Sequence, residues 1–271
     1  MIPKTIHYCW FGRNPKPALV KKCIRSWKEH CPDYKVVEWN EDNFVLNAAP
    51  LYVRQAYEAK KWAFVTDYVR LHVIYEYGGI YLDTDVEVIR NLDDLLNNKA
   101  YFGFETEQTV NTGHGFGAEK GSPVLQDLME VYQNISFLTQ GGVFDTLPCP
   151  ERNTAALQKH GLVPNGSEQV LDGYIHIYPE SFFSPKDFRT GEIHCTEDTY
   201  TIHHFDSSWH TGFEKYLRRK QRSFLKQYGS EQGLKKMKRW RRKHRVLIVL
   251  FREGPKELLR KISQKLSRRG S

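Results

Sequence analysis

Over Trp62–Tyr77, apolar and aromatic side chains recur at three- and four-residue steps, which is the period of an α-helix, at Phe64, Tyr68, Leu71 and Tyr75. The helix should end at Gly78-Gly79, because glycine adopts the left-handed conformation of a helix end without steric cost. A short β-prone run at residues 80–82 then leads into Asp83-Thr84-Asp85. If that strand continues, its two-residue period places both aspartates on the same side.

The same kind of pattern predicts alternating strands and helices over the first 205 residues. We expect strands at residues 2–11, 34–39, 100–105, 114–118, 174–178 and 199–205, and further helices at Ala18–His30, 92–96, 123–138 and 153–160. Such alternation indicates a layered α/β domain. Beyond it, only helices are predicted, at residues 213–228, 232–251 and 256–266.

Charge divides the chain at the same place. The net charge of +8 combines a body of about −9 over residues 1–212 with a tail of about +17 over residues 213–271, where 21 Lys and Arg accompany 4 Asp and Glu. We therefore expect a domain at 1–212 and a basic amphipathic helical tail at 213–271. Basic amphipathic helices bind anionic membrane surfaces or acidic partners, although the charge could also serve as a solvated face.

Several classes of protein are disfavoured. The five cysteines are scattered without a CxxC pair, so neither a zinc site nor a disulfide framework is indicated. Residues 1–12 lack the basic and long apolar stretches of a signal peptide, and the apolar run at 246–251 is too short to span a membrane. No recognition motif accompanies the basic tail, which ranks a nucleic-acid-binding protein low.

The candidate chemistry lies at Asp83 and Asp85. Two carboxylates directed together at a strand end are costly unless a cation lies between them, and hard oxygen ligands suit Mg²⁺ or Mn²⁺. The alternative is a solvated strand end without an ion. Asp67 and Arg70 are three residues apart and share a helix face, where they form either a site or an ordinary surface ion pair.

Two segments resemble glycosyltransferase family 32. One is YGGIYLDTD at residues 77–85, with Ala63, Asp67 and Arg70 upstream of it, and the other is IPKTIHYCWFG at residues 2–12. The family includes bacterial capsular and lipopolysaccharide sugar transferases and is distantly similar to the catalytic core of the large clostridial glucosylating toxins. The resemblance implies a GT-A fold, a Rossmann-like nucleotide-sugar domain with a mixed sheet flanked by helices, here followed by the basic α-helical appendage.

The resemblance also implies roles for individual residues. Trp10 would stack on the nucleobase, where core packing is its competing role. Asp67 and Arg70 would hold the hydroxyls of the donor sugar. Asp83 would contact the sugar or ribose and reach the metal, and Asp85 would bind the metal directly.

A late segment should complete the site. In the toxin relatives, a Ser-x-Trp loop with an acidic residue three positions earlier binds the metal and the phosphates. Ser207 and Trp209 supply that pattern here, and His204 stands where the acidic residue would be. We expect Ser207 and Trp209 to bind the donor, Trp209 to assist catalysis, and His204 to be the third metal ligand. Burial in the core competes with the role of Trp209, and His203 is expected to be a core or loop residue.

These expectations together describe a metal-dependent hexosyltransferase using Mn²⁺ or Mg²⁺. It would transfer a hexose from a nucleotide-sugar, with a UDP-sugar as first choice, to an oligosaccharide or lipid-linked glycan in bacterial capsule or lipopolysaccharide synthesis, with retention of anomeric configuration. The tail would hold it at the inner face of the cell membrane. The alternatives are a DxD-using phosphatase or phosphotransferase, and a glycosyltransferase that acts on a protein.

Overall fold

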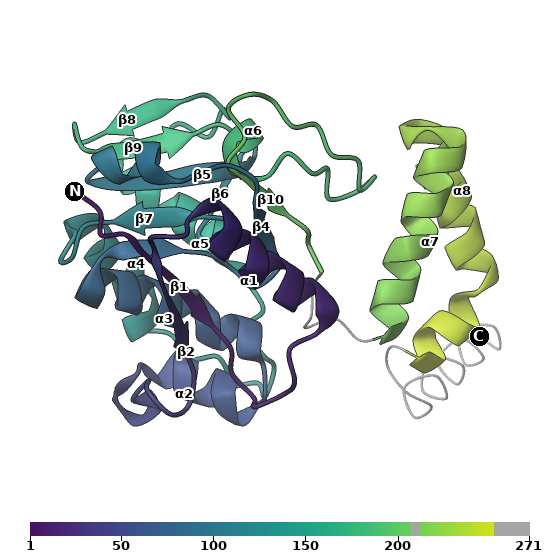
Figure 1. Ribbon diagram of the computed structural model, residues 1–271. Coiled ribbons are helices and arrows are strands. Elements are labelled where there is room, and N and C mark those ends of the chain that lie inside the picture. Colours follow the sequence, from purple (N-terminus) through teal and green to yellow (C-terminus); the bar gives the residue numbers. More distant parts are fainter. Residues whose placement is uncertain (207–211, 252–271) are drawn as a thin grey trace. The chain divides into compact units, whose positions relative to one another are not determined.

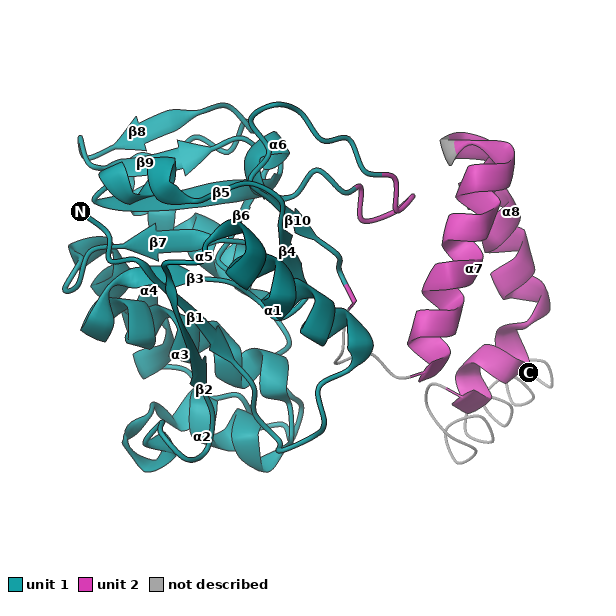
Figure 2. Cartoon of the chain, viewed as in Figure 1, with its two compact units in different colours: residues 1–186, 193–205 teal, residues 187–192, 206–271 magenta. Residues whose placement is uncertain are grey.

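The computed structural model describes residues 1–206 and 212–251, and these belong to two compact units (Figure 1, Figure 2). The first, which we call the α/β unit, comprises residues 1–186 and 193–205. The second, the basic unit, comprises residues 187–192 and the segment from residue 206 onward. The domain boundary predicted at residue 212 thus lies close to this division, and as a boundary between independently folding domains it stays a prediction.

A mixed sheet forms the centre of the α/β unit. Over the described residues it has eight strands in the order β2-β1-β3-β7-β5-β9-β8, with β6 beside β5. Their bounds are β1 Thr5–Cys9, β2 Lys35–Trp39, β3 Gly79–Tyr81, β5 Ala100–Thr106, β6 Thr109–Asn111, β7 Phe116–Ala118, β8 Gln169–Leu171 and β9 Ile175–Tyr178. β1 runs parallel to both β2 and β3, whereas β7 runs antiparallel to β3 and β5. This topology confirms the predicted fold class, an α/β domain of GT-A type.

The order β2-β1-β3 creates a ligand-binding position at one edge of the sheet. From β1 the chain passes to β2 on one side and then returns to form β3 on the other side. In open α/β sheets, ligands bind outside the carboxyl ends of the strands where the order reverses in this way. Trp10 directly follows β1, and Asp83 follows β3 by two residues, so both lie at that edge.

The helices flank the sheet (Figure 1). Their bounds are α1 Ala18–His30, α2 Leu51–Glu58, α3 Trp62–Tyr77, α4 Pro123–Gln133, α5 Cys149–Leu157 and α6 Glu180–Phe183, and short 3₁₀ turns lie at Leu46–Ala48, Asp93–Asn97 and Gln158–His160. The first and third helices have the predicted bounds. The fourth ends at Gln133 rather than at residue 138, and the second was not predicted.

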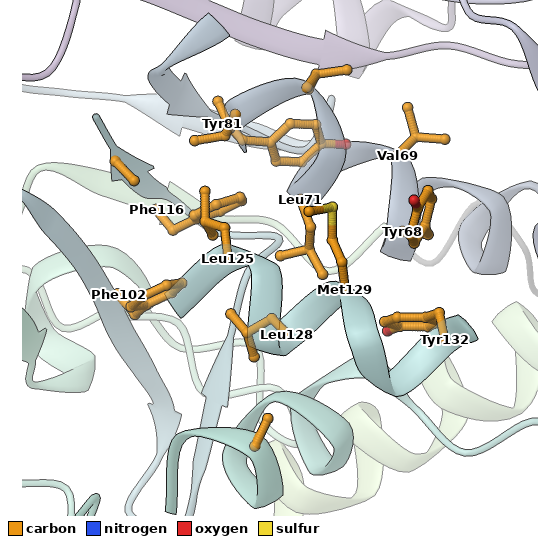
Figure 3. Packing of buried hydrophobic residues seen from close by; sticks show 14 of the residues in the cluster. Tyr68, Val69, Leu71, Tyr81, Phe102, Phe116, Leu125, Leu128, Met129 and Tyr132 are labelled. Carbon is orange, nitrogen blue, oxygen red and sulfur yellow. The ribbon is translucent and has the colours of Figure 1, made fainter. Parts of the chain in front are cut away.

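Two hydrophobic cores cover the two faces of the sheet. Alternate positions along a strand contribute to opposite cores, as Phe102 and Tyr101 of β5 illustrate. Phe102 and Phe116 stack with ring centroids 5.6 Å apart, in the core that also contains residues of α3 and α4 (Figure 3). The other core includes Trp27 of α1, whose indole N–H donates to the Val86 carbonyl at 2.7 Å.

Helix α3 is more deeply buried than its sequence pattern suggested. The predicted apolar stripe included Phe64 and Tyr75, yet both are only partly buried. The fully buried positions include Val65, Val69 and Val73 instead, because α3 contacts α2, α4 and β1 and has little free surface. Its end is as predicted, since Gly78 has φ +67° and its N–H donates to the Ile74 carbonyl at 2.8 Å.

A second, two-stranded sheet brings a late segment back to the candidate site. β4 (Val86–Val88) pairs antiparallel with β10 (Thr201–His203), and His203 lies opposite Val86 in the register. The ladder continues beyond the strands, because the His204 N–H donates to the Asp85 carbonyl at 2.9 Å. Residues more than a hundred positions apart in sequence are therefore neighbours.

The basic unit contains α7 (Gly212–Tyr228) and α8 (Ser230–Lys243), and residues 245–251 are also helical. The helix predicted at 256–266 lies outside the described residues. No helix in the described ranges is both long enough and apolar enough to cross a bilayer.

Candidate metal and donor site

Asp83 and Asp85 are brought together by a turn rather than by a continuing strand. β3 ends at Tyr81, and the Val86 N–H donates to the Asp83 carbonyl at 3.0 Å, which closes the turn before β4 begins. The Asp83 N–H donates to the Gly113 carbonyl at 2.8 Å. These backbone hydrogen bonds hold both carboxylates at the carboxyl edge of the sheet.

Arg70 connects the helix to this turn. Its Nη2 lies 3.3 Å from Asp67 Oδ1 and 3.2 Å from Asp83 Oδ1, and the Tyr81 hydroxyl also donates to Asp83 Oδ1 at 3.0 Å. The side chains of Arg70 and Asp67 are 4% and 9% exposed, so the pair is not an ordinary surface ion pair. A buried ion pair of this kind is a weak source of stability, because both charges lose hydration. We conclude that Arg70 orients the two carboxylates.

Burial changes the protonation of this cluster. It raises the pKa of Asp67 to about 6, against the opposing effect of the Arg70 guanidinium. Burial, with a contribution from the neighbouring Asp85, also raises the pKa of Asp83, although Arg70 acts in the other direction. Burial acts to lower the pKa of Arg70, but the surrounding acidic groups, Asp83 first among them, together raise it well above its ordinary value. The edge therefore concentrates carboxylates that a further cation would stabilise.

His203 is the histidine that lies beside Asp83 and Asp85. Its Nε2 lies 3.4 Å from Asp85 Oδ1, and its Nδ1 lies 3.9 Å from Glu105 Oε1. Burial acts to lower the pKa of His203, but Asp85, Glu105 and Asp83 raise it overall. His203 is buried, as expected of a core residue, and it also lies beside the candidate metal ligands.

His204 does not face this cluster, which corrects its predicted place. Its Nε2 lies 2.7 Å from Glu87 Oε2, and Lys22 Nζ lies 2.7 Å from the same oxygen. The reason is strand alternation. Ile202 pairs with Glu87, so His204, two residues further on, shares the Glu87 side, and His203 faces the other way.

The geometry of Asp83, Asp85 and His203 fits a divalent ion. One ligand atom from each lies within 4.8 Å of the other two. Ligand atoms at about 2.1 Å from a shared ion are separated by roughly 3 to 4.2 Å, so small side-chain adjustments would close the set. Two carboxylates and an imidazole form a donor set that suits Mn²⁺.

Further polar residues lie close to Asp83 and Arg70 and were not predicted from the sequence. The Asn111 amide donates to Glu105 Oε1 at 2.7 Å, and Asn111 Oδ1 accepts from the Gly113 N–H at 2.6 Å. The Cys149 thiol lies 3.7 Å from the same oxygen and 3.9 Å from Arg70 Nη1. The small and polar run NTGHG at residues 111–115, which leads from the end of β6 into β7, was the available signal.

Trp10 lines a separate pocket at the same edge. This pocket of about 240 Å³ is lined by residues of β2 and of the loops after β1 and β2, namely Trp10, Arg13, Asn14, Lys16, Glu38, Asn40, Glu41 and Asp42. The Trp10 indole N–H donates to the Asn14 carbonyl at 2.7 Å, and Lys16 Nζ lies 5.7 Å from the ring centre. Trp10 is partly buried and packs at the margin of the core that contains Trp27. Its role in stacking on a nucleobase stays a prediction, and Ser207 and Trp209 lie outside the described residues.

Comparisons with known proteins find glycosyltransferases. The family model described as "Glycosyltransferase sugar-binding region containing DXD motif" matches residues 17–102. An uncharacterized glycosyltransferase of Acanthamoeba polyphaga mimivirus is 31% identical over 220 residues, which cover 77% of this chain and 84% of the viral protein. Inositol phosphoceramide mannosyltransferase 3 of Schizosaccharomyces pombe is 33% identical over 138 residues, or 49% of this chain.

The match to the yeast proteins is partial. This chain spans 37% of the length of mannosyltransferase 3 and 60% of that of inositol phosphoceramide mannosyltransferase 1. Among solved structures, the PaToxG glycosyltransferase aligns over 58% of this chain and 69% of its own, with a TM-score of 0.47 and 20% identity. The family match and the viral relative, together with Asp83-Thr84-Asp85 at the sheet edge, establish that the chain belongs to the glycosyltransferase family whose sugar-binding region contains the DXD motif.

Proposed function

We propose that this protein is a metal-dependent hexosyltransferase of the family 32 type that uses a nucleotide-sugar donor. The observation that carries the proposal is the convergence of Asp83, Asp85 and His203 beside the buried Asp67–Arg70 pair, at the edge where the strand order reverses. A phosphatase or phosphotransferase, which the paired aspartates alone would allow, has no support from the family match.

Asp83, Asp85 and His203 would hold Mn²⁺ or Mg²⁺. When bound, the ion would stabilise the negative charge that develops on the departing nucleoside diphosphate. In the reaction, the bond between the anomeric carbon and the phosphate oxygen breaks, a bond to the acceptor oxygen forms, and the acceptor hydroxyl gives up its proton. We propose that the configuration at the anomeric carbon is retained.

The remaining residues would position the donor. Asp67 offers carboxylate oxygens that can accept hydrogen bonds from sugar hydroxyls, while Arg70 holds Asp67 and Asp83 in place at 3.3 and 3.2 Å. The pocket beside Trp10 lies at the carboxyl ends of β1 and β2 and would take the nucleobase. In this arrangement the two ends of a UDP-sugar would lie at neighbouring strand ends.

For the acceptor, we propose a lipid-linked glycan of the bacterial capsule or lipopolysaccharide. The names of several relatives describe mannosyl transfer to inositol phosphoceramide, which supports a lipid-borne acceptor and makes mannose a second candidate for the transferred sugar. A protein acceptor is the alternative, and a peptide fraction included in the acceptor screen would reveal it.

A donor screen tests the reaction. Nucleotide release from a panel of UDP- and GDP-sugars is measured with Mn²⁺, with Mg²⁺ and with EDTA. We expect release that depends on the metal and falls at least a hundredfold in Asp85→Asn. The matched control is Asp33→Asn, because Asp33 forms a surface ion pair with Lys4 at 2.6 Å, and this change should leave activity within twofold. Release that EDTA does not affect, or full activity in Asp85→Asn, would reject the proposal.

A further inference from the structure

The two helices of the basic unit form a hairpin with a core of its own. Leu217 and Leu225 of α7 and Met237 of α8 are buried. The helices approach closely at Gly233, where an added Cβ would lie 2.7 Å from the Phe224 carbonyl oxygen. A small set of buried side chains therefore holds the hairpin together, and other apolar residues of this unit are not buried in it.

The apolar run at residues 246–251 is the main unused feature. All six positions are apolar and the segment is helical, yet none of the six is buried in the structure as described. Val246, Leu247 and Phe251 are 60%, 49% and 65% exposed. A helical run of six residues is about 9 Å long, which is far too short to span a bilayer, but a helix lying in the plane of the interface can bury apolar side chains such as these.

Positive charge lies immediately before this run. Residues 212–251 contain fourteen Lys and Arg against two Glu, and six of the basic residues fall within 238–245. Each Lys or Arg near an anionic bilayer contributes about 1 kcal/mol of attraction. Basic residues adjoining exposed apolar ones form the bipartite pattern of a segment that lies in a membrane interface.

We infer that the hairpin docks on an anionic lipid surface, with residues 246–251 inserted among the acyl chains and the basic residues of α8 on the headgroups. Nucleic acid fits less well. A phosphate backbone would satisfy the charge but would leave the exposed Val246, Leu247 and Phe251 in water. Docking of this kind does not depend on the glycosyl transfer proposed above.

Vesicle flotation with the full chain tests the inference. We expect binding to vesicles of phosphatidylcholine with 30% phosphatidylglycerol, and little binding to phosphatidylcholine alone. Neutralising two charges in Arg242→Gln/Lys243→Gln should weaken binding about 30-fold. The matched control is Lys28→Gln/Lys35→Gln, which removes the same charge from exposed positions of the α/β unit and should change binding less than twofold.

A second variant tests insertion separately from charge. Val246→Ser and Leu247→Ser together should weaken vesicle binding at least tenfold while the helical circular dichroism stays unchanged, because both side chains are exposed, at 60% and 49%, and lie outside the hairpin core. Equal binding by this variant would show that only charge acts and would overturn the inserted run. Failure of the full chain to float, or preferential capture by a DNA duplex, would overturn the lipid surface. Asp85→Asn should bind vesicles normally, which separates this result from the catalytic one.

Discussion

Gly113 is the residue whose replacement most directly tests the geometry of the site. A Cβ built at this position overlaps Asp83 Oδ2 and lies 2.9 Å from Arg70 Nη1. The backbone of Gly113 lies outside the left-handed region, so alanine is sterically acceptable to the main chain itself. The effect of Gly113→Ala should therefore fall on the Asp83 carboxylate and the Arg70 guanidinium.

The distance that the Asp83 carboxylate must move determines how far the activity should fall. Ordinary contact begins near 3.4 Å, so the carboxylate must move by roughly 1 Å to accept the methyl group. That movement would lengthen the 3.2 Å contact with Arg70 and the 3.0 Å hydrogen bond from Tyr81. Since a misplacement of about 1 Å at a reacting centre can cost about a hundredfold in rate, we expect kcat/KM to fall about a hundredfold.

Three measurements test the effect of Gly113→Ala. They are metal-dependent nucleotide release, Mn²⁺ binding by calorimetry, and unfolding by urea. Gly141→Ala is the control, because its nearest neighbour, Thr139 Oγ1, lies 4.0 Å from the added Cβ. We expect weaker Mn²⁺ binding and lower activity in Gly113→Ala, and neither change in the control. Activity within threefold of the unmodified protein, with the variant folded, would refute the place of Asp83 in the site.

Two further predictions follow from the histidines. His203→Asn should weaken Mn²⁺ binding at least tenfold and His204→Asn less than twofold, as measured by calorimetry; the opposite order would show that the wrong histidine faces the metal. His7 should stay neutral at pH 5 in a ¹⁵N-detected imidazole titration, because burial lowers its pKa to about 4. The neutral ring fits its contacts, since the Trp39 indole N–H donates to Nδ1 at 3.0 Å and Nε2 lies 3.0 Å from the Gly78 carbonyl oxygen. The unfolded chain binds a proton at His7 near pH 6.5, whereas the folded protein does not. The contribution of His7 to the free energy of unfolding is therefore lost as the pH falls from about 6.5 to 4. A titration midpoint near pH 6.5 for His7 in the folded protein would contradict this prediction.

The bounds of α3 and the α/β class could be predicted from the sequence, because they depend on interactions between residues close together in the chain. The helical period and the Gly78-Gly79 pair give the bounds of α3, because both act within one or two turns of chain. The alternation of strands and helices indicated the α/β class for the same reason. The position of α2 and the early end of α4 depend on packing between helices, which no local pattern in those segments revealed.

The candidate site divides in the same way. The aspartates at 83 and 85 and the division of charge between body and tail are visible in the sequence, because they depend on residue identity alone. The choice of His203 over His204 is not visible there, since the pairing register of β10 with β4 decides which of the two side chains faces Asp83 and Asp85. A shift of one residue in such a register exchanges the two faces of a strand. The burial of Arg70 between Asp67 and Asp83, and the approach of Asn111 and Cys149, likewise exist only once distant segments have packed together.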